Sequence, residues 1–216
     1  MDVILNDEEA RVLACLIEKE MATPEYYPLT LNALLNACNQ KSNREPVVSY
    51  IEETVLKAIE GLKSKQLVWQ SNLSRVLKYE EHFVKDNTYT SGEAAVMCIL
   101  MLRGPQTVGE IRGRTERLHK FENLEEVHDT LESLASMDHA VMQPRRPGHK
   151  EVRYIHHLCG HREEADISAS VPEEIPNQNV SDNTSRIELL EEKVETLTAE
   201  LDELKELFIS FKEEFE

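Results

Sequence analysis

The sequence predicts a mainly helical chain with small β-hairpins, of the α+β class, followed by a separate C-terminal helix. Two observations predict this. A short phrase of proline, threonine and apolar residues occurs twice, 77 positions apart, first at Pro28 and Thr30 and again at Pro105 and Thr107. Near the C-terminus, apolar residues recur at a strict 3–4 spacing. The first observation indicates a duplicated helical unit, and the second indicates a coiled coil.

The first unit contains three helical patterns and then two strand-like runs. Asn6 and Glu9 form the pattern of a capping box at the start of the first helix, and Thr30 is the expected N-cap of the second. The segment SYIEETVLKAIEGLKSK predicts a third helix, and LVWQ and RVLKY predict a hairpin around SNLS. The residues expected on the inner helix faces are Val12, Leu13, Leu16 and Ile17, then Leu31, Leu34 and Leu35, then Ile51, Val55, Ile59 and Leu62. Three helices followed by a hairpin is the order of a winged helix-turn-helix unit.

The second unit repeats this order with shorter connections. Its first helix matches at an offset of 84, its threonine phrase at 77 and its third helix at 72. AVMQPRRPGHKEVRYIHHL supplies the closing hairpin. The sequence therefore predicts two tandem winged-helix units, over residues 1–86 and 87–160. Matched positions include Glu93, Ala94, Val96, Met97 and Leu100, and later Val127, Leu131 and Leu134.

Three segments also resemble a known family. NQKSNREPVV, GPQTVGEIRGRTERLHKF and RYIHHL are similar to the signature segments of the YceH-like family of bacterial proteins of unknown function. The resemblance covers about residues 5–160. It implies a tandem winged-helix fold and a bacterial cytoplasmic protein, and it carries over no activity, ligand, cofactor or catalytic residue.

The remaining residues form two predicted segments. Residues 161–184 are acidic, polar and proline-containing, which is typical of a flexible linker. Residues 185–216 carry the coiled-coil seam, so we expect a homo-oligomer. The phenylalanines near the end fit a tight two-stranded seam less well, and a higher oligomer or packing against another chain stays open. The seam consists of Ile187, Leu190, Val194, Leu197, Leu201, Leu204, Phe208, Phe211 and Phe215.

Charge separates the tail from the rest of the chain. The formal net charge is −17, and residues 161–216 alone contribute −12 with 17 acidic and 5 basic residues. Residues 1–160 therefore carry only −5, which leaves room for a basic surface. No stretch of about 18 apolar residues could span a membrane, and the acidic N-terminus lacks the features of a secretory signal. We expect a cytoplasmic protein whose Cys15, Cys38 and Cys98 are buried and reduced.

The sequence contains no motif that predicts catalysis. It has no phosphate-binding glycine loop, no GxSxG elbow and no HExxH helix, so we expect no enzymatic activity and no cofactor. The densest set of potential metal ligands is His156, His157, Cys159 and His161. Alternation along a strand would point His156 and His157 to opposite faces. A strand end that runs into a linker is therefore favoured over a metal site.

The basic residues favour DNA as a partner. The third helices would present carboxylates such as Glu52, Glu53, Glu125 and Asp129 to DNA. We therefore expect the hairpins, which are the wings of this fold, and the RGRTER segment at residues 112–117 to make the main contacts with DNA. The leading prediction is a DNA-binding regulator. The alternative is a protein-interaction adaptor similar to the winged-helix scaffolds of chromosome segregation, which the acidity suits better. The candidate nucleic-acid-binding residues are Lys41, Asn43 and Arg44 in the first unit, and Arg112, Arg114, Arg117, Lys120, Arg145, Arg146 and Lys150 in the second.

Overall fold

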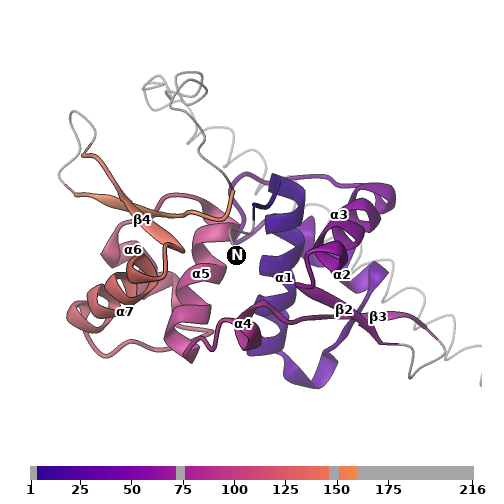
Figure 1. Ribbon diagram of the computed structural model, residues 1–216, viewed down its shortest axis with the longest axis horizontal. Coiled ribbons are helices and arrows are strands. Elements are labelled where there is room, and N and C mark those ends of the chain that lie inside the picture. The colour runs from indigo at the N-terminus through magenta and orange to yellow at the C-terminus, as the bar shows by residue number, and fades with distance from the viewer. Residues whose placement is uncertain (1–3, 72–75, 146–150, 160–216) are drawn as a thin grey trace, which may run out of the picture. The chain divides into compact units, whose positions relative to one another are not determined.

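The computed structural model describes residues 4–71, 76–145 and 151–159 (Figure 1). These residues belong to one compact unit that extends from Met1 to Glu163. The predicted linker at 161–184 and the predicted coiled coil at 185–216 lie outside the described residues, and so do Arg146 and Lys150. No helix within the described ranges is long and apolar enough to cross a membrane.

Helices predominate over short antiparallel strands, so the predicted α+β class is confirmed. The helices are α1 (Asp7–Ala22), α2 (Leu31–Cys38), α3 (Glu52–Ser64), α4 (Phe83–Asp86), α5 (Ser91–Arg103), α6 (Val108–Thr115) and α7 (Leu124–Ser136), with a short 3-10 helix η1 (Pro24–Tyr26). The strands are β1 (Leu29–Thr30), β2 (Val68–Ser71), β3 (Lys78–Glu81), β4 (Ala140–Gln143) and β5 (Arg153–His156).

The same order of elements occurs twice. In the first half α1, α2 and α3 precede the β2–β3 hairpin, and β1 pairs with β3 to give the strand order β1-β3-β2. In the second half α5, α6 and α7 precede the β4–β5 hairpin. Gln106 makes an isolated antiparallel bridge to Tyr154 in β5, at the place that β1 occupies in the first half. The boundary expected at residues 86/87 falls just after α4, and the division into two domains stays a prediction.

Side-chain caps begin the helices where the sequence predicts them. Asn6 and Glu9 form a reciprocal capping box, and the Thr30 hydroxyl accepts a hydrogen bond from the Ala33 N–H. Thr107 caps α6, and its capping box is completed by Glu110. Each cap satisfies a backbone N–H that has no partner within its helix, which fixes the starting residue.

The capping glutamates of α1 and α5, Glu9 and Glu93, also connect each of these helices to the third helix of its half. The Glu9 carboxylate pairs with Lys65 at the end of α3, and the Glu93 carboxylate accepts from the Ser133 hydroxyl of α7 at 2.6 Å. Glu9 lies so close to α3 that a Cβ at Gly61 would meet its Oε1 at 2.1 Å. The third helix is therefore joined to the first by the same capping position in both halves.

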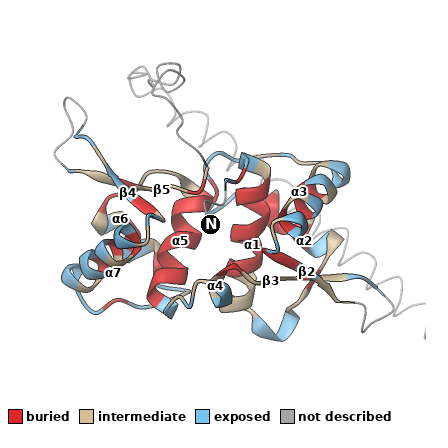
Figure 2. Ribbon diagram, in the orientation of Figure 1, coloured by how far each residue is buried: buried red, intermediate tan, exposed pale blue. Residues whose placement is uncertain are grey.

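Helices α1 and α5 pack against each other at the centre of the described fold (Figure 2). Helix α5 is buried on nearly all sides, which is typical of a central helix rather than a surface one. The Cys98 thiol donates to the Ala14 carbonyl at 3.4 Å. These positions are 84 residues apart, the offset of the repeat, so equivalent points of the two helices touch. One hydrophobic core runs through both halves.

Most of the predicted inner-face residues are confirmed, and two details are wrong. Val55, Ile59 and Leu62 are buried, whereas Ile51 is 64% exposed because it is the N-cap of α3 and lies before the helical turn. Strand β3 begins at Lys78, so the Val76 and Leu77 side chains that were expected in it precede it and are exposed. The burial predicted for Cys15, Cys38 and Cys98 is confirmed, and all three are free thiols.

Candidate nucleic-acid interface

Arg44 is not a surface cation, and its assignment as a nucleic-acid contact is wrong. Its side chain is 0% exposed, and Nη2 donates to the Glu18 carboxylate at 2.6 Å and to the Ala37 carbonyl at 3.0 Å. A second buried arginine, Arg11, donates to the Pro46 carbonyl at 2.7 Å. The Arg44 donors are used inside the fold, so they are not available to phosphate oxygens.

The whole connection from Asn39 to Ile51 is more structured than the polar turn that the sequence predicts. The Asn39 side chain donates to the Tyr50 carbonyl at 2.8 Å and accepts from the Tyr50 N–H at 2.7 Å. The Glu45 N–H donates to the Leu102 carbonyl in α5 at 2.9 Å. The connection is therefore fixed at both ends and attached to the second half of the chain.

This attachment brings the first candidate segment next to an arginine that the sequence did not single out. Lys41 and Asn43 are exposed, and Asn43 has a left-handed backbone with φ 60. Its Oδ1 accepts a hydrogen bond from Nη2 of Arg103, the last residue of α5. In the sequence Arg103 looks like an ordinary basic residue at a helix C-terminus. Arg103 gains Asn43 of the first half as its partner only because the folded 39–51 connection lies against the end of α5.

The two arginines of α6 are engaged within the fold. Arg112 donates to the Glu122 carbonyl at 2.8 Å and holds the connection between α6 and α7. Arg114 lies 3.7 Å from the Glu110 carboxylate, which also pairs with Arg153 at 2.9 Å. Burial alone would raise the pKa of Glu110, but the Thr107 N–H and the two guanidiniums outweigh it and lower that pKa. The charge of Arg114 is thus partly neutralised.

Three of the predicted cations, Lys41, Arg117 and Lys120, remain exposed and without an intramolecular partner among the described residues. Arg117 and Lys120 lie in the connection from Glu116 to Asn123, between α6 and the first turn of α7. Arg145 is also exposed, just beyond the end of β4. Among the candidate residues that the structure describes, the exposed cations therefore lie mainly in the second half, and Lys41 is the one in the first.

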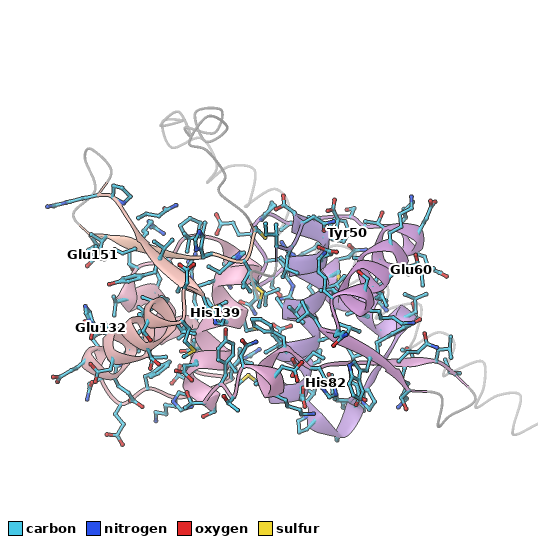
Figure 3. All side chains as sticks on the ribbon, viewed as in Figure 1. Tyr50, Glu60, His82, Glu132, His139 and Glu151 are labelled. Atoms are coloured by element: carbon cyan, nitrogen blue, oxygen red, sulfur yellow. The ribbon has the colours of Figure 1, made fainter. Side chains whose placement is uncertain are left out.

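The third helices carry exposed carboxylates where the sequence predicts them. On α7 the exposed residues include Glu125, Asp129 and Glu132, and His128 lies 3.3 Å from the Glu132 carboxylate. The acidic residues on α3 are likewise exposed, and one residue from each helix is labelled in Figure 3. These carboxylates would repel the phosphates that flank a DNA groove. The exposed acidic residues of α3 are Glu52, Glu53 and Glu60.

Of the four potential metal ligands, His161 lies outside the described residues, and the other three are not gathered into one site within the described ranges. His157 pairs with the Asp138 carboxylate at 3.0 Å, on the turn that precedes β4. Cys159 lies against the Asn6 carbonyl at 4.0 Å, at the start of α1. Within the described ranges no group of three or more His, Cys, Asp or Glu residues could hold a metal ion.

Comparison with known proteins identifies the family. Residues 5–149 match the family described as "Protein of unknown function, DUF480". A UPF0502 protein of Solibacter usitatus is 49% identical over 217 residues, which cover 100% of both chains. A UPF0502 protein of Koribacter versatilis is 48% identical over 91% of this chain and 92% of its own, and one of Geobacter sulfurreducens is 45% identical over 100% of both. The expected membership of a bacterial family of unknown function is confirmed, and the chain belongs to the DUF480 family.

Proposed function

We propose that the protein is a non-enzymatic DNA-binding regulator, and that each half of its folded region is a winged-helix unit. The repeated order of three helices and a hairpin supports the winged-helix assignment. The pairing of β1 with β3 and the bridge from Gln106 to Tyr154 support it further, because they attach the segment before the second helix to the hairpin in both halves.

The single observation that carries the DNA proposal is the pair of exposed cations in the α6–α7 connection. Arg117 and Lys120 have no partner among the described residues, and they lie just before the first turn of α7. In helix-turn-helix proteins the recognition helix, which corresponds to α7 here, approaches the duplex with its N-terminal end. Cations at this place can form charge-assisted bonds with phosphate oxygens.

The carboxylates of α7 define the kind of contact that is proposed. Glu125 and Glu126 occupy the first turn, where they stabilise the helix through its dipole. They oppose insertion of that turn between two phosphate backbones. The proposed contact is therefore with the phosphates and independent of sequence, and Arg145 beyond β4 supplies a second cationic position.

Replacing Arg117 and Lys120 together by alanine is expected to weaken binding to every duplex sequence alike. Loss of two phosphate contacts should also reduce the slope of log affinity against log salt by about 1.8, roughly 0.9 for each contact. Fluorescence anisotropy with a mixed-sequence duplex at several salt concentrations measures both quantities. The full chain and a version ending at Gly160 should be compared. Residues 161–216 carry a net charge of −12, so they would compete with DNA for the basic residues of the protein.

Lys57→Ala is the matched control. Lys57 is an exposed lysine on α3 that pairs with Glu53 at 2.8 Å, and its loss should leave the salt slope unchanged. If neither form of the protein binds duplex DNA in a salt-sensitive manner at low ionic strength, the DNA proposal is rejected.

An adaptor that binds a basic protein surface is the second candidate. The exposed carboxylates of both third helices favour it, because they form acidic faces at the positions where a DNA reader needs cations. Failure of DNA binding in the preceding experiment would leave this candidate as the better one.

We further propose that residues 185–216 make the protein a homo-oligomer. Light scattering should give a mass above the 24.8 kDa of one chain, and the version ending at Gly160 should be monomeric. Leu197→Lys places a charge in the predicted seam and should dissociate the oligomer, whereas Ala199→Lys, on the predicted outer face, should not. A full chain that is monomeric at micromolar concentration would contradict the proposed role of the seam.

A further inference from the structure

Trp69, the only tryptophan of the chain, is exposed on strand β2 of the first hairpin (Figure 1). Its side chain is 53% exposed. The indole stacks on the ring of His82, with 3.9 Å between the ring centroids and 13° between the ring planes. Tryptophan is usually among the most heavily buried residues, because its ring carries the largest apolar surface. An indole that stays open to solvent on a strand is accessible to a ligand.

The stack with His82 fixes the orientation of the indole. Trp69 pairs with Glu80, so His82 lies diagonally across the hairpin from it (Figure 3). His82 is held in turn, since its N–H donates to the Leu67 carbonyl at 2.8 Å and its ring lies 3.9 Å from the Asp86 carboxylate. A ring that is already held in place loses little conformational entropy when a second flat ring stacks on it.

The surface around the indole is polar, which limits the size of any apolar contact. The exposed Val76 and Leu77 precede β3 and lie beyond Lys78 along the chain, so they do not extend the ring surface of Trp69 directly. A patch about one indole wide is far smaller than the roughly 800 Å² that each partner contributes to a stable protein interface. It suits a single flat ring better. The residues that share this face of the hairpin with Trp69 are Ser71, Lys78, Glu80 and His82.

Lys78 supplies a positive charge on the same face. It pairs with Ser71 and is therefore the diagonal neighbour of Trp69 on the side away from His82. Diagonal neighbours in an antiparallel pair lie about 7–8 Å apart, within reach of a lysine side chain. Lys78 has no ion pair among the described residues. The Glu80 carboxylate, directly opposite Trp69, would repel a phosphate, so the charge favours a phosphate on the Lys78 side.

We propose that Trp69 binds an unpaired base of single-stranded DNA by stacking, with Lys78 at a neighbouring phosphate. An open aromatic ring beside a cation is the arrangement by which proteins hold single strands without reading their sequence. This contact goes beyond the proposed phosphate contact with a duplex, in which the bases are already stacked and paired. It rests on the proposal that DNA is the partner, but it uses residues other than Arg117 and Lys120.

The test follows the fluorescence of Trp69 in the full chain, where no other tryptophan contributes to the emission. Addition of oligodeoxythymidylate at low ionic strength should quench the emission, because a base stacks on the indole. An abasic strand of equal length carries the same phosphates without rings and should leave the emission unchanged. An emission that oligodeoxythymidylate does not change would overturn the proposal.

Variants test the two residues by the anisotropy of a fluorescein-labelled oligodeoxythymidylate. Trp69→Ala should weaken binding by roughly tenfold, as expected for the loss of one stacked base. Trp69→Phe keeps a smaller ring and should retain part of the affinity, which protects the test from a folding defect of the alanine variant. Lys78→Gln should reduce the slope of log affinity against log salt by about 0.7, the value for one contact with a single strand. Leu77→Ala, at another exposed apolar residue next to β3, is the matched control and should bind like the parent.

The outcomes separate this proposal from the one that rests on Arg117 and Lys120. If the parent binds a single strand through Trp69 but binds no duplex, the duplex proposal fails and the stacking site stands. If Trp69→Ala and the parent bind the labelled strand equally, or the abasic strand binds as tightly as oligodeoxythymidylate, stacking is overturned. A Trp69→Ala variant that changes only the mass measured by light scattering would make Trp69 a protein contact and also overturn it. Tighter binding of oligouridylate than of oligodeoxythymidylate would overturn the assignment to DNA.

Discussion

Replacing Arg44 by methionine is expected to lower the free energy of unfolding by about 3–5 kcal/mol. The Arg44 side chain is 0% exposed and the Glu18 side chain is 15% exposed, so the variant leaves a largely buried carboxylate without its partner. It also removes the hydrogen bonds to the Ala37 carbonyl and to the Gln40 side chain. Methionine fills much of the same volume, so the loss reports the missing charge and donors rather than a cavity.

The control and the double variant separate these contributions. Lys57→Met removes one member of an exposed pair and should cost less than about 1 kcal/mol. Replacing Arg44 and Glu18 together by methionine should recover part of the stability, because neither charge is then buried alone. Urea unfolding of the version ending at Gly160 measures all four proteins. An Arg44→Met variant within about 1 kcal/mol of the parent would show that the pair does not stabilise the fold.

The elements that the sequence predicts correctly are those determined by neighbouring residues. Asn6 with Glu9 and Thr107 with Glu110 satisfy backbone groups three positions away, so their spacing in the chain is sufficient to locate both helix starts. The repeat is predictable for the same reason, since each helix retains its own apolar spacing. The packing of α1 against α5 does not follow from that spacing. It places Ala14 against Cys98, 84 residues away.

The site residues show where such local inference ends. Arg44 lies in a polar run, which is typical of an exposed turn, and its burial depends on Glu18, 26 residues earlier in α1. Arg103 appears as an ordinary basic residue at a helix end until Asn43 reaches it from 60 residues away. Arg117 and Lys120 are exposed as expected, because both lie in a short connection with no acidic segment folded over it among the described residues.

Stability of the folded region is expected to fall as the pH rises from about 4.5 to about 8, because of Glu81. This residue of β3 is 1% exposed, and burial raises its pKa to about 8 from the value of 4.5 that it has in the unfolded chain. The hydrogen bond and charge of Glu20 raise it further, whereas the Val84 N–H, which donates to Glu81 at 2.9 Å, lowers it.

The sign follows from proton binding. Between the two pKa values the unfolded chain has released the Glu81 proton and the folded chain still holds it, so unfolding is favoured more strongly as the pH rises. A shift of this size corresponds to a loss of up to about 4 kcal/mol between pH 4.5 and pH 8. The repulsion between ionised Glu20 and Glu81 is one of the causes of the raised pKa, so this loss already includes it.

Glu81→Gln is expected to remove this dependence and to make the protein more stable than the parent at pH 8. The amide oxygen can still accept from the Val84 N–H, and the amide N–H can donate to the Glu20 carboxylate, so the contacts of the protonated acid are kept. Glu80→Gln is the matched control, because Glu80 is the neighbouring residue of β3 and is only half-buried.

Urea unfolding at pH 5 and pH 8 measures the free energy of unfolding of the parent and of both variants. Glu81→Gln should gain most at pH 8 and little at pH 5, because a neutral group at position 81 matters only where the parent's carboxyl is driven to ionise. A gain of equal size at both pH values would mean that packing, not ionisation, limits the stability of this strand.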